Sequence, residues 1–277
     1  MESIISTLNG ATPKILLSLP SNRTDVWLVN QDFRKFKLSK NDLSILNNEE
    51  IAQSTRFRFE EHRQQYLLTR FLVRNLLSAY QETPSPEKWV FFNNAYGRPF
   101  IDPTVCALPL FFSISHTKGM IAIAVSSIEY MGIDVERHDS NIDLIDFPSR
   151  CFSEHEVQHL LLLPEDEKKA GFYRLWTLKE SYLKAIGKGL SVPLDSFTIE
   201  ISDDGKIDID HAIKKHFPLL RWQFENYSLN RNCSFSLCFG LMPGTKNHMT
   251  MYKEILPNWR YIERYNTKVV PKDLPNN

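Results

Sequence analysis

A short run with two acidic residues, GIDVE (Gly132–Glu136), is the first part of the chain that could do chemistry. Successive side chains of a strand point to opposite faces, so Asp134 and Glu136 share one face, roughly 6.6 Å apart along the chain. Two carboxylates on one face repel each other unless a cation binds between them, and a hard ion such as Mg²⁺ prefers oxygen ligands. The alternative, and for a lone D-x-E pattern the commoner one, is a solvated and charged strand face.

A second candidate stretch is WTLKESYLKAIGKG (Trp176–Gly189), which has the spacing of an amphipathic helix. Glu180 and Lys184 are one turn apart on it, and as an exposed ion pair they would contribute only about 0.2–0.5 kcal/mol. Gly187 is placed to end the helix in the left-handed conformation. The same pair could instead be a catalytic acid and a phosphate contact, so other segments must decide between the two interpretations.

Two shorter segments offer further polar groups. In SISH (Ser113–His116), which we place in a loop before a strand, Ser115 could donate to a phosphate and His116 could add charge when protonated. A turn cap and a surface histidine are the alternative, and a Ser-His nucleophile is disfavoured because no G-x-S-x-G elbow surrounds the serine. In FSEHE, Ser153 and Glu156 have the spacing of a capping box, although Glu156 could also face a cation.

Arg56 and Arg98 are candidate phosphate ligands, because the planar guanidinium can bind two phosphate oxygens at once. Neither a Walker A loop nor a G-x-G-x-x-G motif is present in the sequence. Any phosphate site must therefore be assembled from separate segments of the chain.

Short strands and two long helices would position these groups. Leu68, Phe71 and Leu72 recur at helical spacing and predict an amphipathic helix, which the prolines that follow it would end. The predicted helices are 60–80, 152–163 and 165–187, and the predicted strands are 25–31, 120–126, 131–136, 219–227 and 234–240, with a hairpin turn at Asp204-Gly205. We expect strands 120–126 and 131–136 to pair with each other through the turn at 127–130.

Each half of the chain thus supplies a long helix and a small sheet. The predicted fold class is α+β, with two similar lobes, each a small antiparallel sheet with a packed long helix, and an active site in the cleft between them. The predicted divisions are an irregular N-terminal lead-in at 1–25, an N-terminal lobe at 26–129, a C-terminal lobe at 130–241 and a polar C-terminal tail at 242–277.

Composition narrows the function classes. Lys+Arg and Asp+Glu both total 33, so no overall charge favours binding to nucleic acid or to an anionic membrane. No apolar run is long enough to span a bilayer, and the N-terminus lacks the basic and apolar regions of a secretory signal. Four cysteines without paired spacing predict reduced thiols in a cytoplasmic protein.

Taken in order, the segments YGRP, FSISH, GIDVE, FSEHE and FYRLWTLKESYLKAIGKGLSVPLDSF make the sequence resemble the 4′-phosphopantetheinyl transferases, in particular the longer two-lobed type that includes the surfactin-synthetase activator. The resemblance covers roughly residues 56–202, with weaker agreement to about residue 240. It implies transfer of 4′-phosphopantetheine from coenzyme A to a serine hydroxyl of an apo acyl or peptidyl carrier protein, with adenosine 3′,5′-bisphosphate as the second product. We also expect a monomer, because two lobes in one chain can each supply half of the cleft, and from the charge balance we expect binding to neither nucleic acid nor membrane.

The resemblance also implies roles for the acidic residues and the lysine. Asp134, Glu136 and Glu180 would bind Mg²⁺ on the coenzyme A pyrophosphate, and Lys184 would contact a phosphate or assist proton transfer. Glu180 would take the serine proton, directly or through water. Glu156 occupies the position at which relatives carry an acid near the metal, so it would be catalytic, position water or only cap its helix.

The expected coenzyme A contacts are Ser115, His116, Arg98, Arg56 and Lys184. The sequence departs mildly from the family pattern, because Arg98 stands where lysine is common. The upstream lysines that relatives use at the adenosine end have no clear counterpart around residues 49–58. The contacts of that end of coenzyme A are therefore not assigned from the sequence.

Two other classes of function remain open at this point. A two-lobed protein could hold coenzyme A or a carrier domain without turnover, although retention of all three carboxylates and Lys184 argues against such a binding module. The same acids with water as nucleophile would make a metal-dependent phosphodiesterase or pyrophosphatase. Hydrolysis of coenzyme A without a carrier would distinguish this last alternative from the transferase.

Overall fold

The computed structural model describes residues 17–265, apart from positions 22, 31, 34, 36, 82, 107–108, 139–143, 145–147, 203, 211–216, 231, 246–248 and 256–260. Residues 1–16 and 266–277, parts of the predicted lead-in and tail, lie outside the described residues. No helix within the described segments combines the length and the apolar composition that a membrane span requires.

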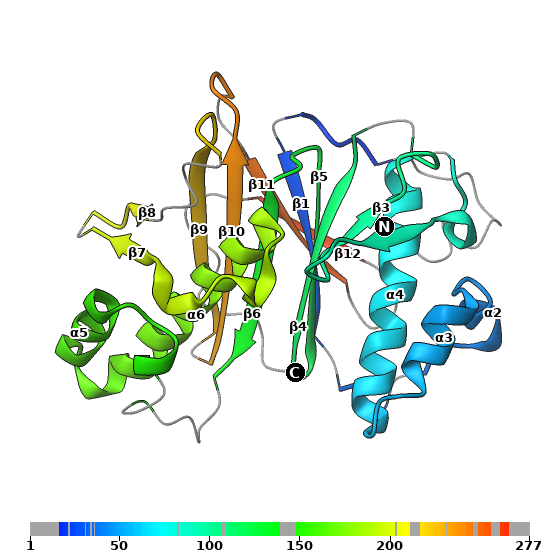
Figure 1. The fold of residues 1–277 in the computed structure, drawn as a ribbon. Coiled ribbons are helices and arrows are strands. Elements are labelled where there is room, and N and C mark those ends of the chain that lie inside the picture. Colours follow the sequence, from blue (N-terminus) through cyan, green and yellow to red (C-terminus); the bar gives the residue numbers. More distant parts are fainter. Residues whose placement is uncertain are drawn as a thin grey trace.

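Two sheets form the centre of the molecule (Figure 1). The larger has the strand order β12-β11-β1-β5-β4 and the smaller has the order β6-β10-β9. The strands are β1 (Arg23–Asn30), β4 (Phe111–Thr117), β5 (Met120–Ser126), β6 (Met131–Arg137), β9 (Arg221–Asn230), β10 (Cys233–Leu241), β11 (Met249–Ile255) and β12 (Tyr261–Tyr265). Two separate hairpins flank them, β2 (Phe91–Asn93) with β3 (Pro99–Ile101) and β7 (Thr198–Ile201) with β8 (Ile207–Asp210).

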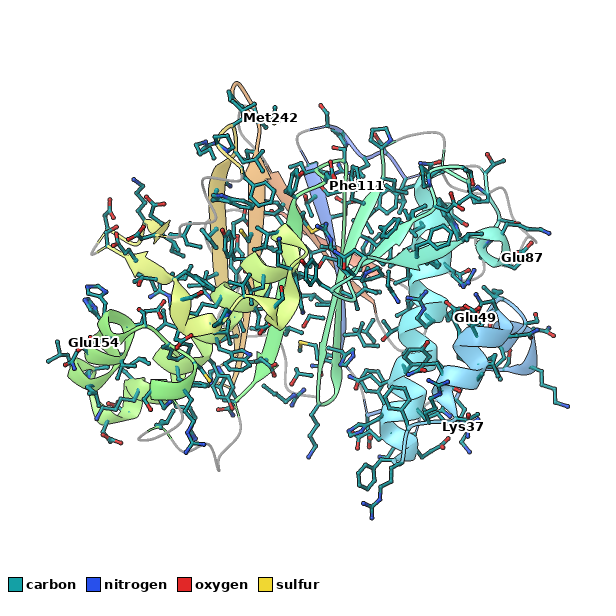
Figure 2. All side chains as sticks on the ribbon, viewed as in Figure 1. Lys37, Glu49, Glu87, Phe111, Glu154 and Met242 are labelled. Atoms are coloured by element: carbon teal, nitrogen blue, oxygen red, sulfur yellow. The ribbon has the colours of Figure 1, made fainter. Side chains whose placement is uncertain are left out.

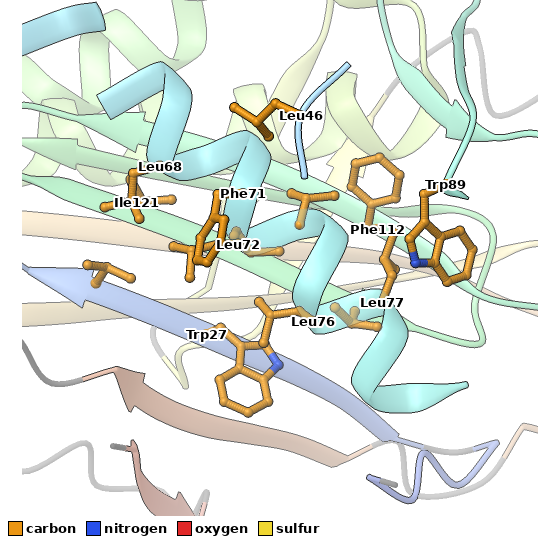
Figure 3. Close-up of a cluster of buried hydrophobic side chains, with 14 of the residues drawn as sticks. Trp27, Leu46, Leu68, Phe71, Leu72, Leu76, Leu77, Trp89, Phe112 and Ile121 are labelled. Carbon is orange, nitrogen blue, oxygen red and sulfur yellow. The ribbon is translucent and has the colours of Figure 1, made fainter. Parts of the chain in front are cut away.

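One long helix packs on each sheet, as Figure 1 shows. Helix α4 (Glu60–Tyr80) lies on the larger sheet and α6 (Glu165–Ile186) on the smaller, with α2 (Lys40–Leu43), α3 (Asn48–Ser54) and α5 (Glu154–Leu162) on the outside. Leu68, Phe71, Leu72 and Leu76 of α4 share a buried cluster with Trp27 of β1 and Ile121 of β5 (Figure 3). The helical spacing of the leucines therefore identified the face of α4 that packs on the sheet.

The two sheets also pack on each other. Val26 and Leu28 of β1 share a buried cluster with Ile133 and Val135 of β6, whereas Trp27, the residue between the first two, faces α4. Because side chains alternate along a strand, each sheet uses one face for its helix and the other for its neighbour sheet, and side chains crowd the space between them (Figure 2). The lobes therefore share a hydrophobic core.

The α+β class and the lobe plan are confirmed, with both long helices close to their predicted bounds. Two local predictions are wrong. SISH lies within strand β4, not in a loop, and β5 does not pair with β6. The reason for the second error is that β1 and β4 already occupy both edges of β5.

The segment predicted as a polar tail contributes to the larger sheet. Strand β11 pairs parallel with β1, and β12 pairs antiparallel with β11, so this sheet is mixed rather than purely antiparallel. A parallel neighbour so distant in sequence leaves no local turn signal. Neither strand was predicted from the sequence.

Candidate active site

Strand β6 carries the GIDVE motif with its two faces in different surroundings. Ile133 and Val135 point into the core between the sheets, and the alternate residues Gly132, Asp134 and Glu136 point toward α6. Asp134 is only 4% exposed. The solvated strand face that the pattern alone also allowed is thus excluded.

Gly132 lets α6 lie directly on β6. A Cβ atom at this position would be 2.0 Å from the carbonyl oxygen of Ser181, 2.6 Å from the amide nitrogen of Ala185 and 2.9 Å from Cβ of Lys184. Two of these contacts are with helix backbone, which cannot move aside as a side-chain end can. The glycine of the motif is therefore required by close approach of the helix.

Lys184 reaches across this contact to Asp134. Its Nζ lies 2.7 Å from Asp134 Oδ1, and the same oxygen accepts a 2.8 Å hydrogen bond from Ser115 Oγ. Ser115 is buried, and its hydroxyl also accepts from the backbone amide of Val135. Ser115 therefore orients Asp134, a contact that the sequence does not indicate, since it predicts a phosphate contact for Ser115.

Ser115 belongs to a row of hydroxyls that joins the two sheets. Ser113, Ser115 and Thr117 alternate along β4, and each side-chain oxygen accepts from a backbone amide of β6, at Ile133, Val135 and Arg137 respectively. Sequence reasoning missed this junction. The period-two spacing of hydroxyls in FSISHT was the signal that could have revealed it.

Glu136 and Glu180 complete a group that we call the acid–lysine cluster: Asp134, Glu136, Glu180 and Lys184. Burial and the charge of Asp134 raise the pKa of Glu136 to about 7, with Glu180 adding to the effect and Lys184 opposing it. Burial and Asp134 likewise raise the pKa of Glu180, again opposed by Lys184. The sequence prediction that these carboxylates share one site is consistent with this electrostatic coupling.

The cluster has an excess of negative charge that a cation would relieve. Asp134 Oδ2 is buried without a hydrogen-bond partner, and an orphaned carboxylate oxygen is costly unless something binds it. Within the described residues, no three His, Cys, Asp or Glu side chains are already drawn together as metal ligands. The donor set fits a hard divalent ion in charge and in atom type, and the Lys184 ammonium is the cation that Asp134 holds here.

The charge of the cluster predicts a pH-dependent stability for the metal-free protein. The unfolded carboxyl of Glu136 titrates near 4.5, so the folded chain holds this proton more tightly. The contribution of the Glu136 carboxyl to the free energy of unfolding is therefore fully present below about pH 4.5 and is lost as the pH rises to about 7. We expect the melting temperature of the wild type, relative to Glu136→Gln, to fall from pH 5 to pH 8, and millimolar Mg²⁺ to raise it at pH 8. A difference that stays constant with pH would contradict the prediction.

His116 connects the cluster to a hollow of about 750 Å³ beside α4, the α4 hollow. Partial burial of the imidazole and, as a smaller effect, the Lys184 cation lower the pKa of His116. Part of the His116 side chain remains exposed. The hollow is lined by Phe57, Phe59, Glu60, Glu61, His62, Gln65, Tyr66, His116, Thr117 and Lys118. Aromatic rings beside groups that can carry positive charge suit a nucleotide. Arg56, also predicted here, is exposed next to Phe57 but does not line the hollow.

Two other predicted site residues are held by contacts with groups outside the cluster. Glu156 is 1% exposed and is fully engaged: its carboxylate caps α5 through the Ser153 amide, accepts from the Ile199 amide and pairs with Lys179 Nζ at 2.7 Å. The helix-cap interpretation of Glu156 is therefore the one that its contacts support. Arg98 donates to backbone carbonyls at the end of α6 and near the start of β6, not toward the α4 hollow.

Comparison with known proteins shows the family of the chain. Residues 130–238 match the model of the 4′-phosphopantetheinyl transferase superfamily. The 4′-phosphopantetheinyl transferase Sfp of Bacillus subtilis is 32% identical over 217 residues, which cover 77% of this chain and 91% of that protein. The 4′-phosphopantetheinyl transferase HetI of a Nostoc strain is 32% identical over 176 residues, which cover 63% of this chain and 73% of the relative. The chain is an enzyme of the 4′-phosphopantetheinyl transferase family.

Proposed function

We propose that the enzyme transfers the 4′-phosphopantetheine group from coenzyme A to a serine hydroxyl of an apo acyl or peptidyl carrier protein and releases adenosine 3′,5′-bisphosphate. The observation that carries this proposal is the acid–lysine cluster at the junction of the two sheets, with the α4 hollow adjoining it at His116. The cluster would hold the pyrophosphate and the hollow the nucleotide. The protein is proposed to act in the cytoplasm as a monomer.

The reaction needs a base, a phosphate clamp and a held nucleophile. The serine oxygen forms a bond to the phosphorus that bears pantetheine, and the bond from that phosphorus to the bridging oxygen breaks, which releases the bisphosphate. Glu180 takes the serine proton, directly or through water, and its raised pKa suits a proton acceptor working near neutral pH. Lys184 places an ammonium beside the phosphate oxygens, where it stabilises developing charge.

Mg²⁺ is the metal that the donor set would accept. Asp134, Glu136 and Glu180 would hold it, and when bound it would neutralise and polarise the phosphate oxygens. Ser115 then has an indirect part, since its hydroxyl fixes Asp134 Oδ1 and leaves Oδ2 as the unpartnered oxygen.

Intact-mass spectrometry tests the proposal. An apo carrier protein incubated with the enzyme, coenzyme A and Mg²⁺ should gain roughly 340 Da, the mass of one phosphopantetheine by its formula. The gain should disappear with EDTA and return when Mg²⁺ is added in excess. Coenzyme A binding without a gain on any of several carrier types would favour a binding module, and release of bisphosphate without a carrier would favour a phosphodiesterase.

A further inference from the structure

The tip of the β2–β3 hairpin reaches onto the end of α6. Asn94 organises this tip, because its Oδ1 accepts from the backbone amides of Tyr96 and Arg98 at 2.9 and 3.0 Å. Its Nδ2 donates to the carbonyl oxygen of Gly187 at 2.7 Å. One side chain thus shapes the turn and attaches it to the residue that ends the helix.

Arg98 extends the attachment to a second element. Its Nη1 donates to the carbonyl oxygen of Ala185 at 2.9 Å, and its Nη2 donates to that of Glu129 at 2.7 Å, with Met131 O at 3.5 Å. Ala185 is in the last turn of α6, and Met131 is the first residue of β6. A single guanidinium therefore bridges the helix and the strand that supply the acid–lysine cluster.

The physical setting explains why an arginine is used here. Carbonyls in the last turn of a helix lack intrahelical partners and carry partial negative charge, so a cation that donates to them is favourable. Burial lowers the pKa of Arg98, and the cost of withdrawing the guanidinium from water is offset by these carbonyl acceptors. Gly187 has φ of 68°, and a Cβ there would be 3.0 Å from Arg98 Cδ, so the helix end leaves room for the arginine.

The bridge lies next to the catalytic contact. Lys184 immediately precedes Ala185, and its Nζ reaches Asp134 on β6 at 2.7 Å. Two connections between the same helix and the same strand thus lie side by side, one through Arg98 to backbone and one through Lys184 to Asp134. A shift of the helix end along the strand would disturb both.

We propose that Arg98 and Asn94 are positioning residues that hold the last turn of α6 against β6, and so keep Lys184 on Asp134, rather than ligands of coenzyme A phosphates. The inference rests on the proposed function for its kinetic consequence. Its structural half concerns only the folded chain and is tested separately.

The kinetic test compares Arg98→Met and Arg98→Lys with Lys168→Met, a matched loss of a cation at the other end of α6. Lys168 pairs with Glu165 on the surface, so its removal should leave turnover unchanged. We expect Arg98→Met to lower kcat about 30–100-fold, because small misplacements of catalytic groups cost about that much. The Kd of coenzyme A, measured by calorimetry without a carrier, should stay within about twofold. Arg98→Lys should recover part of kcat, because an ammonium can reach one carbonyl but cannot fork between two.

Hydrogen exchange supplies the readout that does not depend on activity. The amides of Gly187 and Lys188 bond to the carbonyls of Lys184 and Leu183. They should exchange faster in Arg98→Met and in Asn94→Ala, and at the wild-type rate in Lys168→Met. Faster exchange confined to the end of α6 in these variants, together with a wild type that modifies no carrier, would uphold the clamp while refuting the proposed function.

Two results would overturn the inference. A coenzyme A Kd weakened tenfold or more with kcat preserved would make Arg98 a ligand of coenzyme A, as the sequence alone indicated. Unchanged exchange at the end of α6 in both variants would show that the helix end needs no clamp. If Arg98→Met fails to fold, Asn94→Ala and Arg98→Lys carry the same comparison.

Discussion

Replacement of Gly132 by alanine is expected to destabilise the protein by at least about 3 kcal/mol and to remove nearly all transferase activity. The added methyl would meet the backbone of α6 at 2.0 and 2.6 Å, so the helix must move away from β6. That movement would separate Lys184 from Asp134, now 2.7 Å apart. Urea unfolding and the intact-mass assay measure the two effects.

Gly171→Ala is the matched control, because it adds the same methyl group at another packed surface of α6, on the helix itself rather than on β6. There the new Cβ would approach only the ends of two side chains, Leu163 Cδ1 at 2.5 Å and Leu160 Cδ2 at 3.1 Å. These can shift, and alanine favours a helix over glycine by about 1 kcal/mol. We expect near-normal stability and activity. Equal losses in the two variants would refute the close-approach argument for Gly132.

The second large effect is expected for Glu180→Gln. If Glu180 accepts the serine proton and binds the metal, turnover should fall about 10²–10⁴-fold. The folded protein should lose no stability, because the raised pKa of Glu180 means that its ionised form is disfavoured in the metal-free fold. An amide of the same shape removes that cost, so above neutral pH the melting temperature of the metal-free variant should equal or exceed that of the wild type.

Glu165→Gln provides the comparison on the same helix. Glu165 is exposed and pairs with Lys168 at the surface, so its neutralisation should change neither turnover nor melting temperature appreciably. Full activity in Glu180→Gln would remove Glu180 from the mechanism. A marked loss of stability in Glu180→Gln would show that the Glu180 charge stabilises the fold.

The sequence determined both long helices, several of the strands and the enzyme family. Apolar spacing gave α4 and α6, because a helix that packs on one sheet must repeat its apolar residues every three or four positions. The order of five short motifs indicated the family, and the Ser153–Glu156 spacing indicated the capping box that the structure contains. These are properties of contiguous segments, so local reasoning reaches them.

Only the tertiary structure decided which partners the polar side chains have. Ser115, Arg98 and Glu156 were predicted as site residues, and the structure adds partners that the sequence does not show: Asp134, the carbonyls around α6 and β6, and Lys179, each distant in sequence. Strand β11 beside β1 is likewise a pairing between opposite ends of the chain. A side chain's chemistry is set by its residue type, but its availability is set by the neighbours that bind it, and neighbours that are distant in sequence come together only when the chain folds.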